Sequence, residues 1–505
     1  MNNLWKSFKS IIISKLGLLF LSLLITPMLT RLLGSDGYGD YAFMLSAFGL
    51  ITTLSHSGVF NAIRKYMSEK NTTPDWGPRI LGFYSRISVL LVFFICAALI
   101  LITSSELFSA YFPENYETYF YVLAAWVAFS QIYAVARGAL MGLQLESYSE
   151  PLQIVDRILF ISITVPLIYL QWGVLGVLIG RLISITIVGV VGIYLVSREI
   201  TLKYVFKLGV PGKSKKKLLA YNLDSILLAI LTVSLYNVDL LLLRPIAGST
   251  QTGYYKAALV VVQFIWFVPS AVQYSLVHSV SELWSAGETD EVSQIASEVT
   301  RYSIAFIMIL IIGLSVLADE FMPVYFGSKF GVSVVPLLIL LPGTVGFAIA
   351  RPIFAIGQGI GKVRTLVYAT GMAALINLIL NIILIPRFGL IGASIATTVG
   401  YLSMLVLHIW SAKKIGFNPI SDLRLRKLFP ACISTLAVVY SLSLLFQGDI
   451  ISLLVIPPAG FLFYSIAVLN TSFVSDHEFE KLVKKSPAPI RKILTRVTPH
   501  RNKIS

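Results

Sequence analysis

The stretch TRLLGSDGYGDYAF, from Thr30 to Phe43, lies between two apolar runs that are each long enough to cross a bilayer. A weaker copy, RPIAGSTQTGYYKAA, runs from Arg244 to Ala258. Four residues recur with a shift of 214 positions, namely Gly34, Ser35, Gly39 and Tyr41 as Gly248, Ser249, Gly253 and Tyr255. This recurrence is the first indication that the chain contains two related halves.

Further matches support the repeat. The shift of 214 positions also carries Arg137 onto Arg351, and the segment GVLG at 173–176 is answered by GLIG at 389–392 with a shift of 216. Because the matches cluster at loops and helix ends and the shift hardly drifts, we interpret the chain as two homologous halves in tandem.

The composition places the chain in a membrane. Of its 505 residues, 56% are hydrophobic and 13% are charged, and the mean hydropathy is +0.81. Soluble proteins carry about a quarter charged residues. The net charge of +15 comes from Lys and Arg in short loops beside apolar segments, where they set membrane orientation and do not indicate a nucleic-acid partner. Both cysteines fall inside apolar runs, so neither a disulfide framework nor a metal site is expected.

Fourteen apolar segments are predicted to span the membrane as helices, which gives an all-α integral membrane fold. Twelve lie in the repeat and two beyond it, at roughly 11–31, 41–63, 80–103, 118–143, 152–170, 173–196, 218–243, 257–280, 301–318, 334–357, 365–386, 389–411, 428–447 and 449–469. The predicted parts are a six-helix lobe at 1–205, a second at 206–412, two further helices at 413–473 and a basic cytoplasmic tail at 474–505.

The orientation follows from the loops. Lys and Arg concentrate in the N-terminal tail, in alternate loops and in the C-terminal tail, which puts both termini in the cytoplasm of a multi-pass protein of the cell membrane. Six spans per half return the chain to the side it left, so the halves are parallel repeats. In transporters built this way the substrate cavity lies between the halves and rocking gives alternating access. The segment 197–217 is the predicted hinge-side linker.

Charged residues inside spans are candidates for function because each is costly in hydrocarbon. The deepest basic ones are Arg86, Arg137, Arg181 and Arg351. Guanidinium groups bind phosphate in a bidentate manner, so these four predict an anionic cargo. Others lie nearer the cytoplasmic ends and are expected to extend to the interface, namely Lys15, Arg64, Arg157 and Arg301.

Other candidates keep two interpretations. Asp224 and Asp239 could take up a coupling proton or sodium ion, or neutralise nearby Arg. Asn377 and Asn381 share one helix face, where they could hydrogen-bond to another helix or contact sugar. Gly34, Gly37 and Gly39 permit positive φ in a short external connection. With their counterparts they form either a gating turn or a plain tight turn, and the turn residues are Gly34, Gly39, Gly248 and Gly253.

No catalytic motif is present. The sequence has no Walker A, HExxH, CxxC or GxSxG pattern, and its longest loops, near 20 residues, cannot fold into a soluble enzyme. We therefore expect no enzymatic activity and no cofactor apart from a coupling proton or sodium ion.

At the end of the first span the chain resembles the polysaccharide-transport group, the O-antigen and capsule flippases, of the multidrug/oligosaccharidyl-lipid/polysaccharide (MOP) flippase superfamily. The resemblance rests on Arg31–Gly34 followed by Gly39-Asp40-Tyr41, on the YFG at 325–327 and on FGLIGASIATTVG from Phe388. It implies V-shaped lobes around a cationic cavity. The implied activity is flipping of polyprenyl-diphosphate-linked oligosaccharides from the cytoplasmic to the outer leaflet. The last two helices would line a groove for the lipid tail.

Three functions remain open at this point. A lipid-linked oligosaccharide flippase is preferred, with the lipid-linked glycan and the bilayer as partners and polymerase or glycosyltransferase machinery as a further one. A cation-coupled exporter of the multidrug (MATE) branch usually has twelve helices and a less basic cavity. An integral-membrane glycan polymerase or ligase typically needs a large external loop, and every external connection in this chain is short.

Overall fold

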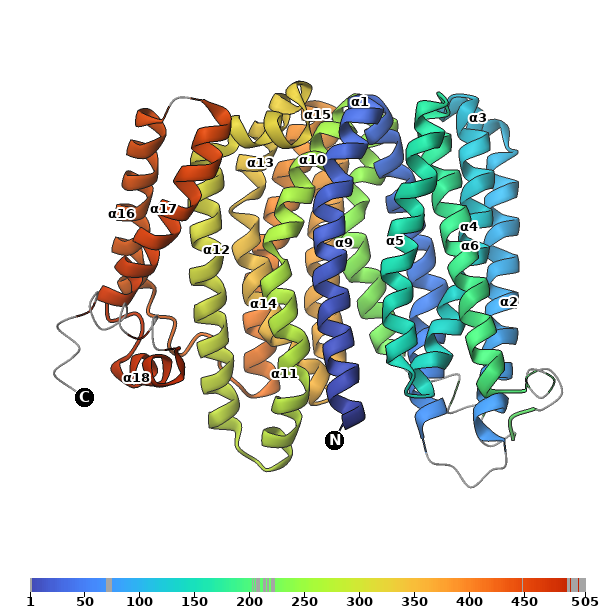
Figure 1. Ribbon diagram of the computed structural model, residues 1–505, viewed down its shortest axis with the longest axis horizontal. Helices are drawn as coiled ribbons and strands as arrows, with labels where there is room; N and C mark the ends of the chain where they lie inside the picture. The colour runs from blue at the N-terminus through green and yellow to red at the C-terminus, as the bar shows by residue number, and fades with distance from the viewer. Residues whose placement is uncertain are drawn as a thin grey trace. The chain divides into compact units, whose positions relative to one another are not determined.

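The computed structural model describes residues 2–69, 75–201, 223–446 and 448–487, together with a few positions between 203 and 218 and residues 491 and 498. In these residues every regular element is a helix (Figure 1). Three predicted segments lie partly outside the described residues. They are the linker at 197–217, the basic tail at 474–505 and the start of the seventh predicted span, at residues 219–222.

Most consecutive helices are joined by connections of only a few residues. In chain order the helices are α1 (Asn2–Ser68), α2 (Trp76–Thr103), α3 (Glu106–Tyr111), α4 (Asn115–Gly142), α5 (Glu146–Tyr169), α6 (Gly173–Glu199), α9 (Leu223–Ala247), α10 (Ser249–Ile265), α11 (Phe267–Ser285), α12 (Thr289–Phe326), the 3-10 helix η1 (Ser328–Ser333), α13 (Val334–Leu340), α14 (Gly343–Gly359), α15 (Val363–Ile415), α16 (Leu425–Leu445), α17 (Asp449–Asn470) and α18 (Asp476–Lys485).

The prediction of about fourteen spans is confirmed. Among the described residues, ten helices are long and apolar enough to cross a membrane, or twelve if each of two bent pairs is one span. Two of the twelve, α1 and α15, each join two helices across a kink, at Gly34 and at Gly389. Counting the halves of α1 and α15 separately gives the fourteen predicted spans.

Two spans predicted as single straight helices are bent. The span predicted at 257–280 consists of α10 and the first part of α11, with a bend of 45°, and the span predicted at 334–357 consists of η1, α13 and α14, with a bend of 54°. The second break falls at Pro342, the N-cap of α14, where the ring removes a backbone donor. The apolar run continues through both bends, so hydropathy gives no sign of them.

The backbone supports the two-fold repeat. Gly34 and Gly248, which match with the shift of 214, have φ angles of 68° and 88°. Gly173 and Gly389, which match with the shift of 216, have φ angles of 51° and 53°. Glycine adopts positive φ without the steric penalty that other residues suffer. The recurring glycines therefore mark equivalent turns of the two halves.

Contacts divide the chain into two compact units. Unit 1 comprises Met1–Lys256 and Leu378–Ala393, and unit 2 comprises Ala257–Asn377 and Ser394–Ser505. These limits differ from the lobes predicted at 1–205 and 206–412, because α9, which packs against α1, and the start of α10 fall in unit 1. The lobe boundaries stay a prediction.

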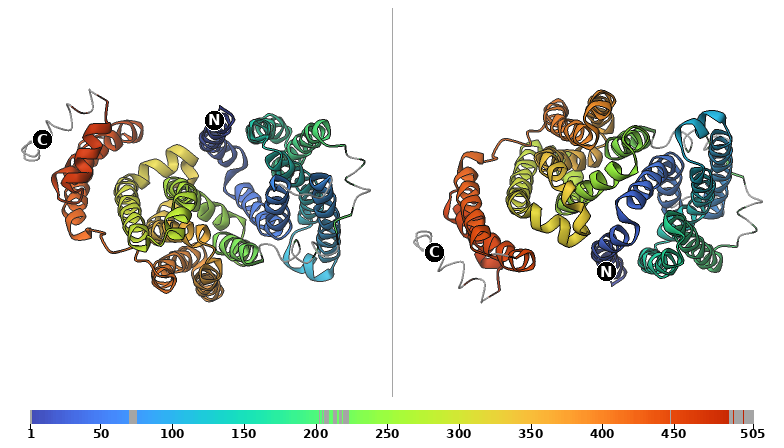
Figure 2. Two further views of the ribbon diagram at one scale, coloured as in Figure 1. Left: turned by 90° about the horizontal axis from the view of Figure 1, so that it is seen from below. Right: turned by 90° about the horizontal axis from the view of Figure 1, so that it is seen from above.

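In unit 1, α2, α4, α5 and α6 form a bundle with α1 (Figures 1 and 2). Helix α4 lies at the centre of the bundle. Of its most apolar stretch of 18 residues, 56% are buried, whereas 17% are buried in the corresponding stretch of α2. Large apolar side chains of α2, including Phe93, Phe94 and Leu101, are more than half exposed. An apolar surface of this kind is stable against lipid and not against water.

In unit 2, α16 and α17 lie side by side and pack on α12 (Figure 1). The Tyr464 hydroxyl donates to the Ala305 carbonyl oxygen at 2.7 Å, which joins α17 to α12. The outer faces of α16 and α17 expose leucines such as Leu445 and Leu454, as lipid-facing helices do. These are the two helices predicted beyond the repeat.

Candidate functional site

A cavity of about 440 Å³ lies in unit 1, between α1, α4, α5 and α6. Its lining combines aromatic rings with charged groups, and the charged residues are Arg137, Asp156, Arg157 and Arg181. Two of the four arginines predicted from the sequence to hold an anion, Arg137 and Arg181, are therefore brought together. The two come from neighbouring helices, α4 and α6, which pack closely along their length.

Arg181 is held in place from two sides. Its Nη1 lies 2.7 Å from Oδ2 of Asp156, and the Ser184 hydroxyl donates to the other oxygen of that carboxylate at 3.1 Å. The guanidinium also lies over the rings of Trp126 and Phe160, with the Cζ atom 5.9 and 5.6 Å from their centroids. A buried guanidinium needs such a carboxylate, since the desolvation penalty is otherwise several kcal/mol.

Arg137 is paired in the same way. Its Nη2 donates to Oε1 of Glu150 at 3.0 Å, and Nε2 of Gln153 donates to the other oxygen of Glu150 at 2.8 Å. The guanidinium lies over the Phe60 ring at 5.2 Å. Its Nε atom is buried and makes no hydrogen bond to any residue that the structure describes, so the group keeps donor capacity inside the unit.

Arg157 is the third cation of the cavity, and it differs from the other two. No hydrogen bond or salt bridge joins its side chain to any residue that the structure describes. The expectation that Arg157 extends to the interface is wrong, because its side chain lines the cavity. With Asp156 and Glu150 as the two carboxylates, three arginines leave the cavity one positive charge in excess.

The other two predicted cations lie elsewhere. Arg86 on α2 is exposed and its Nη2 donates to the Val205 carbonyl oxygen at 3.4 Å. Arg351 on α14 belongs to unit 2, where its Nη1 donates to Oε1 of Gln273 at 2.9 Å and its guanidinium stacks 3.8 Å from the Phe347 centroid. Their role in anion binding stays a prediction.

The remaining polar candidates differ in burial. Asp224 is exposed in the first turn of α9, whereas Asp239 is fully buried. Asn377 and Asn381 are fully buried, and Nδ2 of Asn377 donates to the Thr397 hydroxyl at 3.4 Å. That contact corresponds to the interhelical interpretation of Asn377, and sugar contact by either asparagine stays a prediction.

The two predicted turns pack against each other in unit 1. A Cβ added to Gly39 would overlap the carbonyl oxygen of Ser249, and a Cβ added to Gly253 would overlap the carbonyl oxygen of Ser35. The prediction of positive φ is wrong for Gly37 and Gly39, which lie in the continuing helix. Gly39 and Gly253 are required for close approach of two backbones. Gly39 and Gly253 are related by the shift of 214 positions, as are Ser35 and Ser249, so the contact joins equivalent residues of the two repeats.

Polar side chains reinforce the contact between the turns. Oδ1 of Asp40 accepts from Nε of Arg244 at 2.9 Å and from the hydroxyls of Tyr116 and Ser249, each at 2.5 Å. The Arg244 guanidinium also lies 4.5 Å from the Tyr116 ring centroid. Sequence reasoning missed this network. The signal available was Asp40 inside the repeated turn and Arg244 at the start of its copy.

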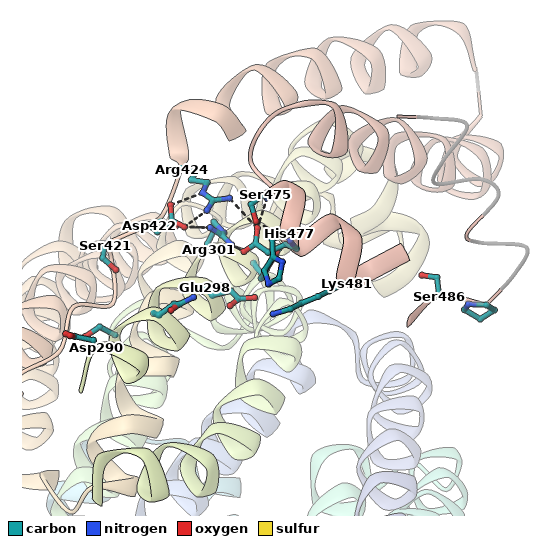
Figure 3. Close-up of a pocket in the computed structure, with 15 residues that line it drawn as sticks. Asp290, Glu298, Arg301, Ser421, Asp422, Arg424, Ser475, His477, Lys481 and Ser486 are labelled. Carbon is teal, nitrogen blue, oxygen red and sulfur yellow. Dashed lines mark hydrogen bonds and ion pairs between the residues drawn. The ribbon is translucent and has the colours of Figure 1, made fainter. Parts of the chain in front are cut away.

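A larger cavity, of about 700 Å³, lies in unit 2 beside α18 (Figure 3). Arg301 is 1% exposed and is bound to Asp422 and Glu478, and Arg424 is bound to the same two carboxylates. The expectation that Arg301 extends to the interface is wrong, because these carboxylates bury it. Both guanidinium groups are neutralised, so this cavity is a weaker candidate for an anionic cargo than the one in unit 1.

The N-terminal cap of α18 explains this cluster. The Ser475 side chain accepts from the Glu478 backbone, and the Glu478 carboxylate accepts from the Ser475 backbone, which is a capping box. The box fixes the Glu478 carboxylate, which binds both Arg301 and Arg424. Among the residues with described side chains, no group of three or more His, Cys, Asp or Glu could hold a metal ion.

Comparison with known proteins places these features in context. A family model described as "Polysaccharide biosynthesis protein" matches residues 4–274. An uncharacterized membrane protein of Methanocaldococcus jannaschii is 24% identical over 408 residues, which cover 79% of this chain and 94% of that protein. The probable low-salt glycan biosynthesis flippase Agl15 of Haloferax volcanii is 26% identical over 264 residues, which cover 50% of this chain and 53% of that protein.

Solved structures share the fold. The lipid II flippase MurJ in an inward closed conformation superposes with a TM-score of 0.70 and 16% identity, over 94% of this chain and 99% of that one. An inward-facing multidrug resistance MATE transporter of the MOP superfamily gives a TM-score of 0.65 and 15% identity, over 79% and 98%. The predicted fold class is thereby confirmed. The similar proteins whose names state an activity are flippases and transporters, not enzymes.

Proposed function

The chain belongs to the polysaccharide biosynthesis protein family. We propose that it flips a polyprenyl-diphosphate-linked oligosaccharide from the cytoplasmic to the outer leaflet. It is a multi-pass membrane protein, and a lipid-linked glycan is the cargo consistent with the family. Both termini are proposed to be cytoplasmic, on the distribution of Lys and Arg.

One observation carries the proposal, namely the excess positive charge of the cavity in unit 1. Arg157 makes no salt bridge with a described residue, so its guanidinium is available to a diphosphate. Arg137 and Arg181 are held by carboxylates and aromatic rings, which orient their guanidinium groups. Because the carboxylates partly neutralise these two cations, they bind an anion more weakly. A transporter must release its cargo, and partly neutralised cations bind a diphosphate without trapping it.

The repeated turns supply the second element of the mechanism. Asp40, Arg244 and the Gly39–Gly253 contact join the two turns at the end of unit 1 opposite the N-terminus (Figure 1). With a cytoplasmic N-terminus, this contact closes the outer side. Separation of the turns then opens a route for the glycan to the outer leaflet, as alternating access requires.

The test uses purified protein in liposomes that contain a short-chain fluorescent polyprenyl-diphosphate oligosaccharide. Loss of lectin or quencher accessibility on one leaflet measures flipping. A charge-assisted hydrogen bond contributes about 1.5–3 kcal/mol, so Arg157→Gln is expected to lower the flipping rate at limiting substrate by roughly 10- to 150-fold. Arg64→Gln removes an exposed arginine of α1 and is the matched control, with an unchanged rate expected.

Three outcomes are informative. Flipping by the native chain that falls only in Arg157→Gln supports both the function and the site. Flipping that Arg157→Gln leaves unchanged refutes the role of Arg157. No flipping with a proton or a sodium gradient, together with export of organic cations by the same liposomes, overturns the function in favour of the exporter.

A further inference from the structure

A side chain at the α9–α10 turn contacts the kink of α15, and the proposed mechanism does not use this contact. Oε1 of Gln251, the third residue of α10, accepts from the Leu390 backbone N–H at 2.9 Å. Leu390 directly follows Gly389, the residue at which α15 is kinked. Both residues belong to unit 1. The bond therefore joins two connections of the second repeat that lie 139 positions apart in the chain.

The Leu390 N–H needs an acceptor from outside its own helix. The first N–H groups of a helix have no carbonyl one turn earlier to accept from them. The kink at Gly389 makes Leu390 the start of a new helical segment, and Leu390 is buried. A buried N–H group without an acceptor is costly, and the amide oxygen of Gln251 supplies the acceptor. Gln251 thus caps the second half of α15 from a different helix.

Gly389 leaves the space that this amide occupies. A Cβ added to Gly389 would overlap Oε1 of Gln251. The φ angle of Gly389 is 53°, which glycine adopts without a steric penalty. Glycine is therefore required at this position for two reasons, the kink of the backbone and the approach of the Gln251 side chain.

The first repeat brings the equivalent residues together without this hydrogen bond. The shift of 214 relates Gln251 to Gly37, and the shift of 216 relates Leu390 to Val174. A Cβ added to Gly37 would lie 3.5 Å from Cγ2 of Val174, so the equivalent connections also meet. Glycine has no side chain that could accept from a backbone N–H. The side-chain bond between the two connections is therefore specific to the second repeat.

We propose that Gln251 is a positioning residue that fastens the α9–α10 turn to the kink of α15, so that turn and kink move as one body when Gly39 and Gly253 separate. The Asp40 carboxylate, which joins the turns, binds Arg244 and two hydroxyls, so that network can break while the Gln251 bond stays intact. The separation of the turns rests on the proposed function, whereas the fastening of turn to kink does not.

The experiment measures alkylation of the purified full chain by a maleimide. It needs no glycan, so its failure is separate from failure of the proposed function. Two reporters are placed singly in a chain with Cys96→Ala and Cys432→Ala, namely Thr252→Cys at the turn and Leu390→Cys at the kink, both at buried positions. Leu390→Cys keeps the backbone N–H that donates to Gln251.

Gln251→Met keeps the length of the side chain and removes the acceptor. It is expected to raise the alkylation rate of Leu390→Cys by about fivefold or more, because a buried N–H group then lacks its acceptor. The rate of Thr252→Cys is expected to stay at the parent value, which also shows that the variant folds. Gln251→Glu retains an acceptor oxygen and is expected to keep Leu390→Cys protected. Asp40→Asn is expected to raise the rate of Thr252→Cys and not that of Leu390→Cys.

Two results overturn the proposal. The first is an equal rate for Leu390→Cys in Gln251→Met and in its parent. The second is a rise for Leu390→Cys in Asp40→Asn as large as the rise for Thr252→Cys, because the kink would then stay behind when the turn moves. The second result needs no change at Gln251, so the proposal is tested even if Gln251→Met does not fold.

Discussion

Asp40→Asn is the sharpest perturbation of the contact between the repeated turns. The substitution keeps the size of the side chain and removes the charge that accepts from Arg244, Tyr116 and Ser249. Arg244 is 9% exposed, so its guanidinium then lies buried without this carboxylate. Because the network joins the turns, its loss is expected to favour their separation.

The magnitude follows from the geometry. Removing one partner of a buried ion pair costs about 3–5 kcal/mol. Arg244 keeps its hydrogen bond of 2.7 Å to the Tyr116 hydroxyl and its position over that ring, which favours the lower end of this range. Since about 1.4 kcal/mol changes an equilibrium tenfold, a loss of about 3 kcal/mol shifts the balance towards separated turns by roughly 100-fold.

The assay reads this shift at Thr252, which is fully buried beside Gly253 in the joined turns. A Thr252→Cys reporter is placed in a chain with Cys96→Ala and Cys432→Ala, the only native cysteines. The rate of alkylation by a membrane-impermeant maleimide is expected to rise roughly 100-fold with Asp40→Asn, in proportion to the separated population.

Asp36→Asn is the matched control for this assay. Asp36 is exposed and accepts from the exposed Thr250, and exposed polar pairs contribute about 0–1 kcal/mol, so the rate should change by less than about fivefold. Equal alkylation rates in Asp40→Asn and in its parent would refute the reasoning. A larger rise in Asp36→Asn than in Asp40→Asn would do the same.

Three further predictions concern unit 2 and the turns. Arg301→Gln leaves Asp422 and Glu478 with Arg424 as their bound cation and removes charge-assisted hydrogen bonds, so it is expected to lower the free energy of unfolding by about 1.5–3 kcal/mol; an unchanged Tm contradicts this. Burial raises the pKa of Glu478, but hydrogen bonds from its capping serine and the charges of Arg301 and Arg424 outweigh burial and hold that pKa below its ordinary value of about 4.3. The stabilisation is therefore complete above the ordinary pKa and lost as the pH falls through the lowered one, which limited proteolysis of α18 between pH 3 and about pH 6 checks. Gly253→Ala is expected to abolish flipping, whereas Gly49→Ala, whose added Cβ meets no other described part of the structure within 4 Å, is the neutral control; equal flipping by both refutes the close approach.

Several features of the fold could be predicted because their causes are local. Apolar runs of about 20 residues span a bilayer whatever their neighbours are, so the spans follow from hydropathy. Gly34 and Gly248 adopt positive φ because the turn requires it at each copy. The bends of α10–α11 and α13–α14 could not be predicted from the sequence, because the apolar run continues through each of them.

The candidate site was predicted only in part. The sequence indicated Arg137 and Arg181 as cavity cations, because charged residues deep in a span need a reason to be there. It assigned Arg157 and Arg301 the same interfacial role, yet one lines the cavity of unit 1 and the other is buried between carboxylates of unit 2. Depth along a span does not tell which neighbour a side chain faces.

The sequence by itself determined that this is a repeated, all-helical membrane protein with cations inside its spans. The tertiary structure decided which of those cations are neutralised. Arg181 meets Asp156, 25 positions away, whereas Arg244 meets Asp40, 204 positions away. A buried charge is neutralised by a residue of a helix that packs against it. Which helices pack together does not show in the periodicity of the sequence, so the partner could not be predicted. The close approach of Gly39 and Gly253 could not be predicted for the same reason.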